Sequence, residues 1–314
     1  MAFSGSSTRP WYPVNGETEL IERIRRQVPL PRGSGIVLGI GDDCAIYRPR
    51  GSAEDLLFTT DLLVEDVHFR RATHRAPDAG WKALARALSD IAAMGGEARF
   101  FLVSLALPRW ADTRWVAGFY RGLLRLAART GVTLVGGDVG RGAKLMCDIV
   151  VCGAVPRGCA LRRDGARAGD SIYVSGRLGG PALGLAKRSG AAWRRHLRPE
   201  PRLALGRFLR VTVRATGAMD LSDGLSLDLR RFAAASKLAA EIEAPPRFAG
   251  ASLEQALHGG EDYELLFTAP PRAQVPARFE DVPLTRIGVM RRGHPGTVLL
   301  DGRPLPALGF DHFR

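Results

Sequence analysis

Aspartates recur along the chain in or beside short stretches rich in glycine, serine and threonine, each following an apolar run. The formal net charge is +13, so an acidic composition does not explain these carboxylates. Carboxylates that converge repel one another unless a strong cation lies between them. Oxygen-rich turns of this kind suit Mg²⁺ that is shared with phosphates. The pattern therefore predicts a metal-dependent nucleotide enzyme. The aspartates concerned are Asp42, Asp43, Asp61, Asp90, Asp138, Asp220 and Asp223.

Length and composition indicate a soluble globular protein. The 314 residues are enough for one large domain or two ordinary ones, and 46% are hydrophobic and 25% charged. No apolar run approaches the roughly 20 residues that span a bilayer. Residues 1–16 lack the apolar stretch of a secretory signal and are expected to form a flexible arm. The four cysteines show no CxxC spacing, which favours reduced thiols and a cytoplasmic location.

The basic balance raises nucleic-acid binding as an alternative. Lys and Arg number 45 against 32 Asp and Glu. The arginines are scattered from Arg23 to Arg314, without a dense tract or interleaved aromatic residues. A solvated arginine-rich surface is the favoured interpretation, so we expect neither a nucleic-acid partner nor a membrane. A basic nucleic-acid-binding protein is the remote alternative.

Hydrophobic periodicity predicts an α/β (α+β) fold with mixed sheets. Apolar runs alternate with amphipathic segments, and a strand-to-strand hairpin expected near Arg141 argues against a purely parallel sheet. A Gly/Arg/Ala-rich connector, 156–169, places a domain boundary near Pro156. The expected helices are 18–27, 81–94, 113–129, 181–187, 201–216 and one from Ser226. The expected strands are 35–40, 56–60, 100–107, 132–135, 145–155, 171–174 and 263–268, with short ones near Ile287 and at 298–300.

Each aspartate motif also has a structural interpretation. Ile40-Gly-Asp-Asp43 can be an Asp-rich turn, and Asp90 stands four residues after Arg86, the spacing of a surface ion pair. Ser222 and Asp223 are N-cap candidates for the helix that follows.

Known nucleotide-binding loops are missing from the sequence. Leu134-Val-Gly-Gly-Asp138 is expected to be a strand that runs into a Gly-Gly turn, but the following residues do not match G-x-x-x-x-G-K-[ST]. No G-x-G-x-x-G follows a strand, and there is no H-R-D catalytic loop. Nucleotide binding must use another scheme.

Taken in order, the motifs resemble the thiamine-monophosphate kinase family of the PurM/AIR-synthetase-like superfamily. The resemblance covers the chain nearly end to end, which makes it far more specific than any single motif. The matching stretches are GIGDDCAI (39–46), TTDLLVEDVHF (59–69), WKALARALSDIAAMGG (81–96), LVGGD (134–138), GDSIYVSGRLGG (169–180), MDLSDGLSLDL (219–229), ALHGGEDYELLFT (256–268) and GFDHF (309–313).

The resemblance implies ATP-dependent phosphorylation of thiamine monophosphate to thiamine diphosphate, with release of ADP and with several Mg²⁺ ions. It also implies a two-domain PurM-like fold and a homodimer. The N-terminal domain would be 17–155, pairing through its sheet, and the C-terminal α/β domain 156–314.

The resemblance further implies roles for individual residues. The metal ligands would be Asp43, Thr59, Thr60, Asp61, Asp90, Asp138, Asp220 and Asp223, of which Asp43, Asp90 and Asp220 are the expected catalytic residues. The ATP contacts would be Gly137, Asp138, Arg163, Ser222 and Tyr120, and the thiamine phosphate contacts would be His68, Glu261 and Phe310.

The sequence departs from the family pattern at two places. Val139-Gly140 stands where the family commonly has two threonines, and Asp66 stands where it commonly has glycine. Neither removes an expected metal ligand. The nearest rivals are other ATP-using members of the superfamily, such as AIR synthetase, selenophosphate synthetase or a hydrogenase-maturation protein. Residues 1–30 contain no cysteine, which argues against selenophosphate synthetase.

Overall fold

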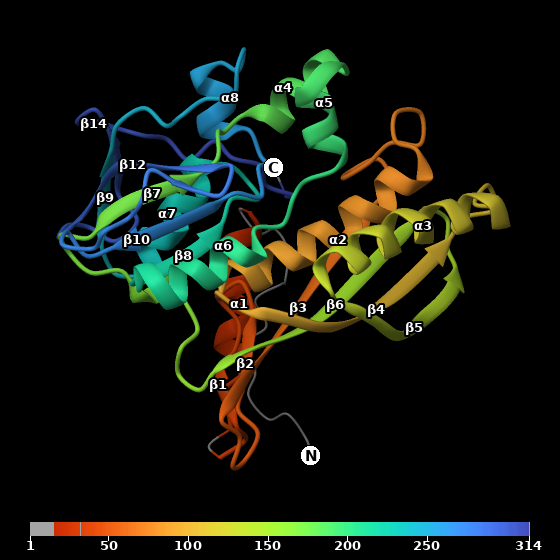
Figure 1. The fold of residues 1–314 in the computed structure, drawn as a ribbon, viewed down its shortest axis with the longest axis horizontal. Coiled ribbons are helices and arrows are strands. Elements are labelled where there is room, and N and C mark those ends of the chain that lie inside the picture. The colour runs from red at the N-terminus through yellow and green to blue at the C-terminus, as the bar shows by residue number, and fades with distance from the viewer. Residues whose placement is uncertain (1–15, 32, 314) are drawn as a thin grey trace.

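The computed structural model describes residues 16–31 and 33–313, which form two mixed β-sheets with helices packed on them (Figure 1). The arm predicted for residues 1–16 lies outside the described residues apart from Gly16. No helix in these ranges is both long enough and apolar enough to cross a membrane.

The first sheet is antiparallel except at one edge, where β4 and β5 run parallel. Its strands, in spatial order, are β1 (Ile36–Leu38), β2 (Ala45–Tyr47), β3 (Glu54–Val64), β6 (Met146–Pro156), β4 (Glu97–Leu107) and β5 (Thr133–Arg141).

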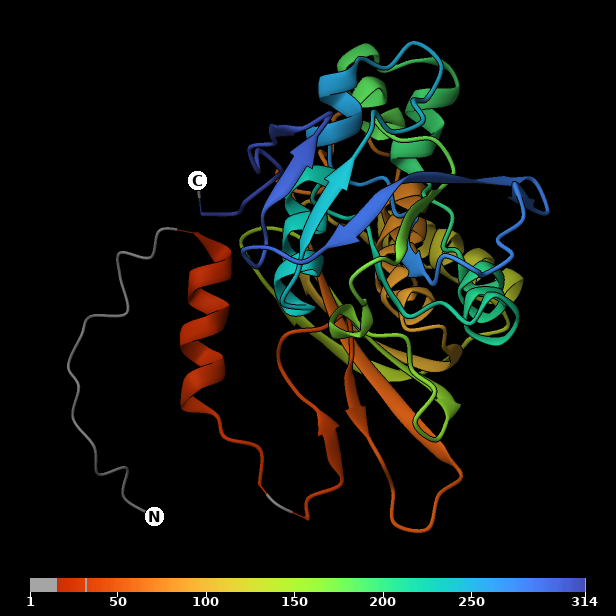
Figure 2. The ribbon, with the colours of Figure 1, turned by 90° about the vertical axis from the view of Figure 1, so that its left-hand side faces the viewer.

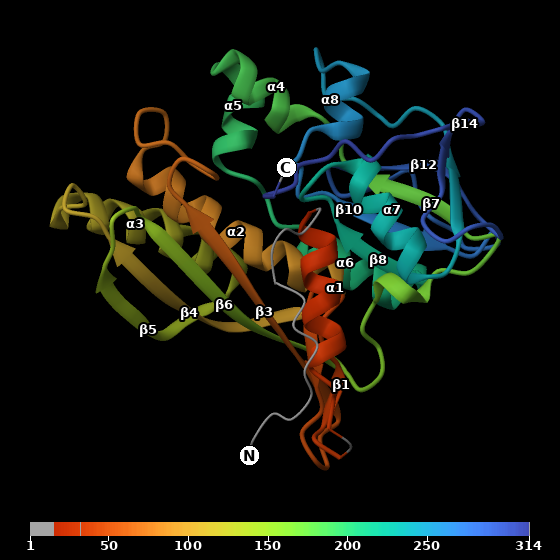
Figure 3. The ribbon, with the colours of Figure 1, turned by 180° about the vertical axis from the view of Figure 1, so that it is seen from behind.

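One face of the first sheet is buried under α2 (Ala76–Ala93) and α3 (Thr113–Thr130). Side chains alternate along a strand, so Leu57 and Leu63 of β3 reach this core while Phe58 and Leu62 are left exposed on the other face. In Figure 3 both helices lie on the same side of the sheet, and none of the helices that the structure describes packs on the opposite side. The sheet therefore has one covered face and one open face.

The second sheet is also mixed, with a single parallel pair formed by β9 and β13. In spatial order its strands are β14 (Arg303–Pro304), β13 (Val298–Leu300), β9 (Ala239–Ile242), β12 (Val282–Arg291), β7 (Ser171–Ser175), β10 (Leu265–Ala269) and β8 (Gly217–Asp220), with β11 (Arg278–Phe279) paired to β12.

The remaining helices surround the second sheet, except for α1 (Glu17–Gln27), which stands along one side of the molecule (Figure 2). Glu17 at the start of α1 donates its backbone N–H to Asp311 of the C-terminal tail at 3.2 Å. The other helical elements are η1 (Arg163–Gly165), α4 (Gly180–Lys187), α5 (Gly190–Leu197), α6 (Leu203–Phe208), the π-helical turn η2 (Leu209–Val213), α7 (Leu225–Ala235) and α8 (Leu253–His258).

Helix α2 joins the two halves of the molecule because it is buried nearly all round. It packs on the first sheet and also against α6 and β8 of the second half. Alanines spread along the helix let neighbours approach closely on several sides, and Gly95 ends the helix in the left-handed conformation (φ 66°). The predicted amphipathic helix over 81–94 is therefore confirmed, but it begins earlier and has little exposed surface.

Three local predictions are wrong. The Gly-Gly of 134–138 is not a turn, because β5 continues through it to Arg141. No hairpin forms near Arg141, since β4 lies between β5 and β6 in the sheet. The helix predicted over 201–216 is broken into α6 and η2 and ends before Thr216.

The N-cap prediction for α7 is also wrong. Neither Ser222 nor Asp223 caps this helix, whose N-cap is Gly224. Instead Asp228, inside the helix, accepts the backbone N–H groups of Asp223 and Gly224, both at 3.0 Å. The turn that carries Asp223 is thus held by a carboxylate from the helix that follows.

Glycine permits the close crossing of α2 and α3. A Cβ added at Gly122 would lie 1.8 Å from the backbone oxygen of Pro77, so the two helices would have to separate. We expect Gly122→Ala to lower the free energy of unfolding by about 2 kcal/mol through overpacking. Urea unfolding measures this. Gly140→Ala is the control, since nothing lies within 4 Å of the added Cβ there. An equal effect in both variants would contradict the argument.

Candidate active site

Three of the predicted aspartates converge between the two sheets. Asp43 comes from the turn after β1, Asp90 from α2 and Asp220 from the end of β8. One carboxylate oxygen from each lies within 4.8 Å of the others. Burial, together with the neighbouring carboxylates, raises the pKa of Asp90 and of Asp220 well above the usual range. We call Asp43, Asp90 and Asp220 the carboxylate triad.

Neighbouring hydroxyl groups orient the triad. Ser89 donates its Oγ–H to Asp220 Oδ2 at 2.7 Å, and Thr59 donates to Asp90. Thr59 lies on the covered face of β3, so its side chain points toward α2. These bonds hold two carboxylates in place without neutralising them.

Arg163 connects the triad to the adjacent Asp42. Its guanidinium forms an ion pair with Asp43, and its backbone N–H donates to Asp42 Oδ2 at 3.1 Å. Burial and the neighbouring Asp43 raise the pKa of Asp42 to about 7. The predicted ATP contact Arg163 and the predicted metal ligand Asp43 thus meet directly.

Asp61 lies near the triad but is paired with a different group. Arg86 Nη2 donates to Asp61 Oδ1 at 2.8 Å. The alternative in which Arg86 pairs with Asp90 on a helix surface is wrong, since Asp90 accepts from Thr59 instead. Arg86 is nearly buried, with a side-chain exposure of 11%, so this pair belongs to the site interior.

Thr60 and Asp138 lie on the open face of the first sheet, and of these two Thr60 also lines the cavity described below. The register places Leu62, Asp148, Ser104 and Asp138 opposite one another across β3, β6, β4 and β5, so their side chains share one face. Thr60 donates its hydroxyl to Asp148 on this face. The predicted metal ligands therefore divide between the two faces of the sheet.

Gly137 and Tyr120 also lie apart from the triad. Gly137 is on β5, which is three strand spacings, or about 14 Å, from β3. Tyr120 is half-buried on α3 and packs edge-on against Phe119, with ring centroids 5.8 Å apart. Within one chain, the residues predicted to contact ATP do not form a single cluster.

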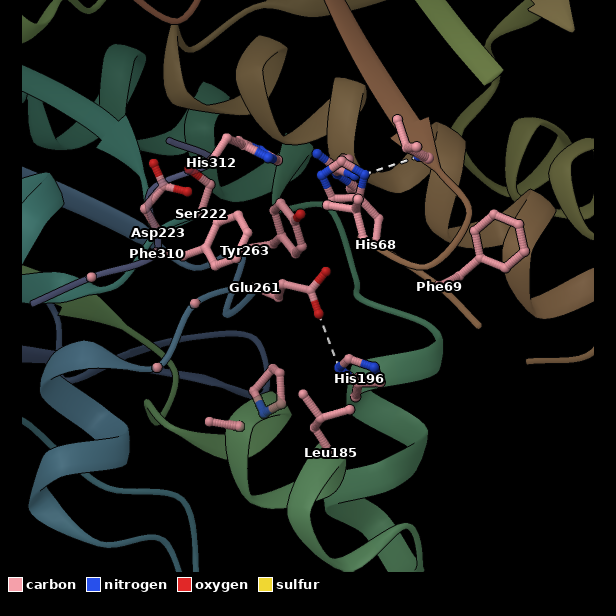
Figure 4. Close-up of a pocket in the computed structure, with 18 of the residues that line it drawn as sticks. His68, Phe69, Leu185, His196, Ser222, Asp223, Glu261, Tyr263, Phe310 and His312 are labelled. Carbon is pink, nitrogen blue, oxygen red and sulfur yellow. Dashed lines mark hydrogen bonds and ion pairs between the residues drawn. The ribbon is translucent and has the colours of Figure 1, made fainter. Parts of the chain in front are cut away.

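A cavity of about 1060 Å³ opens beside the triad. Figure 4 shows Ser222, Asp223 and Phe310 on one side of it, His196 and Leu185 on another, and Glu261 between them. Of the predicted site residues, the cavity wall includes Thr60, Asp61, His68, Asp90, Asp220, Ser222, Asp223, Glu261 and Phe310.

Glu261 is the centre of a charged network in the cavity wall. Lys82, which is fully buried, lies 2.7 Å from one Glu261 oxygen, and His196 Nδ1 lies 2.9 Å from the other. Burial alone would raise the pKa of Glu261, but Lys82 and His196 outweigh burial and hold it well below the usual range. Glu261 has a left-handed backbone (φ 67°), as does Tyr263 (φ 48°). The loop before β10 thus holds a strained shape that presents an ionised carboxylate.

His68 faces the same cavity as a neutral ring, and its hydrogen bond defines which ring nitrogen carries the proton. Its Nδ1 accepts the backbone N–H of Val64 at 2.9 Å, which leaves Nε2 to carry the proton of the neutral ring. Burial and the positive charge of Arg86 lower the pKa of His68 to about 3. The ring of His312, from the C-terminal tail, lies 5.2 Å from the His68 ring between centroids. The ring of Phe310 lies 4.8 Å from that of His312.

The segment between β8 and α7 completes the wall. The backbone carbonyl of Ser222 accepts the backbone N–H of Glu261 at 2.7 Å. The backbone carbonyl of Asp223 accepts the backbone N–H of Phe310 at 2.9 Å. The Asp223 side chain forms an ion pair with Arg231. Backbone bonds thus join the loops that carry Ser222, Glu261 and Phe310.

Sequence reasoning missed several residues of the site. Lys82 and Arg86 fall on the face of the predicted amphipathic helix that was expected to be polar and exposed. His196 and Asp148 belong to no motif. A signal was present for Lys82 and Arg86, because both fall inside the WKALARALSD stretch. The missed residues are Lys82, Arg86, Asp148, His196 and Tyr263.

Comparisons with known proteins identify the class to which this fold and site belong. Residues 41–158 match the family model "AIR synthase related protein, N-terminal domain". The chain is 39% identical to the thiamine-monophosphate kinase of Escherichia coli K12, over 95% of this chain and 98% of the relative. It is 37% identical to that of Haemophilus influenzae, with the same coverage.

Solved structures give the same result. The structure described as "AaThiL complexed with AMPPCP and TMP" matches with a TM-score of 0.82 and 33% identity, covering 95% of this chain and 97% of that one. The thiamine-monophosphate kinase of Stenotrophomonas maltophilia K279a matches with a TM-score of 0.72 and 40% identity, covering 90% and 96%. Hydrogenase maturation proteins HypE match at 15–23% identity, which shows a shared fold alone.

The protein is therefore an AIR-synthase-related, PurM-like enzyme with two mixed sheets and a carboxylate-rich site between them. Within that class, the chain belongs to the thiamine-monophosphate kinase family. The predicted fold class and the resemblance seen in the sequence are both confirmed.

The neutral state of His68 predicts a pH effect on stability. Its folded pKa of about 3 lies below the ordinary 6.5, so between these values the unfolded chain binds a proton that the folded chain does not. This contribution lowers stability as pH falls from 6.5 toward 3. We expect His68→Asn to lose less stability than the wild type between pH 7 and pH 5, measured by urea unfolding. The control is His294→Asn, at an exposed position. Parallel pH profiles for His68→Asn and the wild type would contradict the prediction.

Proposed function

We propose that the protein phosphorylates thiamine monophosphate with ATP, giving thiamine diphosphate and ADP. The observation that supports this most directly is the carboxylate triad beside a cavity of about 1060 Å³. Membership of the thiamine-monophosphate kinase family supports the choice of substrate. A solved relative in complex with AMPPCP and TMP supports a site that takes both a nucleotide and the thiamine compound.

We propose that the triad holds Mg²⁺. Three carboxylates crowded into a buried space are a costly arrangement without a cation, and oxygen ligands are those that Mg²⁺ prefers. Bound Mg²⁺ would offset the negative charge of the two phosphate groups that must meet. Asp61 and Asp223 are nearby but paired with Arg86 and Arg231, and Thr59 supports Asp90 through its hydroxyl. We propose that these three, together with Thr60 and Asp138, serve as further ligands.

The reaction places few demands on acid–base groups. The nucleophile is an oxygen of a phosphate monoester, which is largely ionised at neutral pH because its second pKa is about 6. Phosphoryl transfer depends mainly on position and charge. We therefore propose positioning roles for the chain's own residues. Arg163 and Ser222 would hold phosphate oxygens, with Gly137, Asp138 and Tyr120 as further ATP contacts.

The thiamine end would lie along the Glu261 side of the cavity. Thiamine carries a fixed positive charge on its thiazolium ring. The Glu261 carboxylate stays ionised, which favours a cation, and the exposed ring of Phe310 offers an aromatic face to the same charge. His68 lies on the same wall and contributes a neutral N–H donor.

A coupled assay tests the proposed reaction. Purified protein is incubated with ATP, Mg²⁺ and thiamine monophosphate, and thiamine diphosphate and ADP are followed by chromatography. Equal amounts of both products are expected. Release of ADP without thiamine diphosphate would reject this acceptor and favour another reaction of the superfamily.

The triad assignment predicts that Asp90→Asn separates activity from stability. We expect turnover to be lost, since a ligand is removed, while the metal-free variant is at least as stable as the wild type because a buried like-charge repulsion is relieved. Turnover and thermal unfolding without metal measure the two effects. In addition, Mg²⁺ is expected to raise the melting temperature of the wild type more than that of the variant.

Asp301→Asn is the matched control. Asp301 is exposed in the turn between β13 and β14, and its left-handed backbone suits Asn. Wild-type turnover by Asp90→Asn would reject the metal assignment.

We also propose that the protein is a homodimer joined through the open face of the first sheet. This face carries exposed apolar side chains, including Phe58, Leu62 and Met146, which are 36%, 43% and 39% exposed. An apolar sheet face of this kind is typical of a protein interface. If Asp138 serves the same nucleotide as the triad, a second copy must supply it, because the sheet separates the two within one chain.

The dimer proposal predicts that Leu62→Glu yields monomers, because it places a charge among the exposed apolar side chains of the open face. Sedimentation velocity measures the oligomeric state. Leu253→Glu is the control, since Leu253 is similarly exposed at 37% but lies on α8 in the other half of the molecule. A wild-type protein that sediments as a monomer would reject the proposal.

The division into domains at 155/156 and the cytoplasmic location stay predictions. The family model ends at residue 158 and the first sheet ends at Pro156, which supports the proposed boundary. The four cysteines are free thiols, which supports the proposed location.

A further inference from the structure

Arg86 is a cation in the cavity wall to which the proposed reaction has given no task so far. It lies on α2 one turn before the triad residue Asp90 and one turn after Lys82, which pairs with Glu261. Residues four apart lie on one face of a helix, so α2 presents these three side chains in line. Arg86, Asp90 and Glu261 all line the cavity. Arg86 thus stands between the end of the cavity proposed for the phosphates and the end proposed for the thiamine rings.

The guanidinium of Arg86 meets the cavity beside Asp61. Nη2 donates to Asp61 Oδ1 at 2.8 Å, and Nη1 donates to the backbone oxygen of Leu62 at 3.3 Å. The side chains of Arg86 and Asp61 are 11% and 19% exposed, and both line the cavity. Nε is enclosed and has no hydrogen-bond partner among the described residues, so a ligand would be met by the two Nη groups. Each Nη carries two N–H groups, of which one is left for a further partner.

Arg86 differs from the other arginines that pair with predicted metal ligands. Arg163 and Arg231 each form an ion pair with a second carboxylate besides the predicted ligand. Within the part of the chain that the structure describes, Asp61 is the only carboxylate that forms an ion pair with Arg86. If Asp61 binds a metal ion, Arg86 is left without its anion. A buried cation without a partner is costly, so Arg86 would then need another anion within reach.

The surroundings of Arg86 favour the acceptor phosphate over the phosphates of ATP. The charge of Arg86 adds to burial in lowering the pKa of His68, a proposed contact of thiamine monophosphate, which shows that the two groups are close. Arg163, a proposed ATP contact, approaches the triad from another direction, through Asp43. Arg86 therefore lies on the acceptor side of the triad.

We propose that Arg86 is a positioning residue that exchanges partners: its guanidinium leaves Asp61 to the metal and donates instead to the phosphate of thiamine monophosphate. This inference rests on the proposed function, in which Asp61 is a further metal ligand. A guanidinium matches two phosphate oxygens with paired N–H groups, and a phosphate monoester carries up to two negative charges. The ion pair with Asp61 holds the guanidinium at the cavity until both ligands arrive.

Binding of Mg²⁺ without substrate tests the first half of the exchange. Arg86→Met removes the charge and keeps much of the length, and Arg125→Met, at an exposed position on α3, is the matched control. We expect Arg86→Met to bind Mg²⁺ about tenfold more tightly than the wild type in calorimetry, because the guanidinium no longer competes for Asp61. In an Asp61→Asn background, Arg86→Met should have no further effect. Arg86→Gln, which can still donate to Asp61, carries the same expectations if Arg86→Met does not fold.

Binding of the phosphate tests the second half. With saturating Mg²⁺ and no ATP, Arg86→Met should weaken the binding of thiamine monophosphate about tenfold, the size of one hydrogen bond to a charged group. Thiamine, which lacks the phosphate, and a non-hydrolysable ATP analogue should each bind Arg86→Met and the wild type equally within about twofold. Thiamine separates the phosphate from the rings, and the ATP analogue separates the two sources of phosphate.

The outcomes distinguish this inference from the proposed function. A merely structural role for Arg86 would weaken the binding of both Mg²⁺ and thiamine monophosphate, and that result would overturn the exchange. A gain in Mg²⁺ affinity that persists in the Asp61→Asn background would overturn it too, as would a loss for the ATP analogue in place of thiamine monophosphate. In each case a wild type that phosphorylates thiamine monophosphate leaves the proposed function standing. If the wild type neither binds nor phosphorylates thiamine monophosphate, the proposed function fails and this inference fails with it.

Discussion

The mutual repulsion of Asp43, Asp90 and Asp220 is the constraint on which the rest of the structure depends. Three carboxylates within 4.8 Å are tolerated because hydroxyl groups of Ser89 and Thr59 and the guanidinium of Arg163 hold them from outside. These supporting groups come from the helix, strand and turn that form the junction between the two halves. The packing of α2 against both sheets thus holds together groups whose charges would otherwise drive them apart.

Glu261 forms a second charged cluster in the cavity wall, together with Lys82 and His196. Its fully buried partner Lys82 would be costly to bury alone, and Glu261 would be costly without a cation nearby, so each needs the other. The pair joins α2 to the loop before β10, and His196 extends it to α5. The same helix therefore carries one triad carboxylate and the cation that keeps Glu261 ionised. Both ends of the proposed substrate would therefore be bound by residues of α2 or of segments that pair with it.

The first sheet uses its two faces for different purposes. The covered face carries Thr59 and Asp61 toward the helix and the site, while the open face carries Thr60, Asp148 and Asp138 among apolar side chains. Alternation along β3 alone places adjacent predicted ligands on opposite faces. The family resemblance assigns Thr59, Thr60, Asp61 and Asp138 to metal binding, and a second chain on the open face is the physical means by which they would serve one site.

Sequence alone determined the fold class and the family and placed several predicted residues in the cavity wall, because most of the motifs combine a local apolar run with an adjacent segment that carries a functional side chain. The family resemblance predicted Asp43, Asp90, Asp220, His68, Glu261 and Phe310 as site residues, and the structure places the first three close together and the other three in the cavity wall. Tertiary structure decided which face each ligand occupies, that β5 continues through its glycines, and that Lys82 and His196 meet at Glu261. Those facts depend on strand order, register and helix packing between segments distant in the chain, and local spacing carries no information about such contacts.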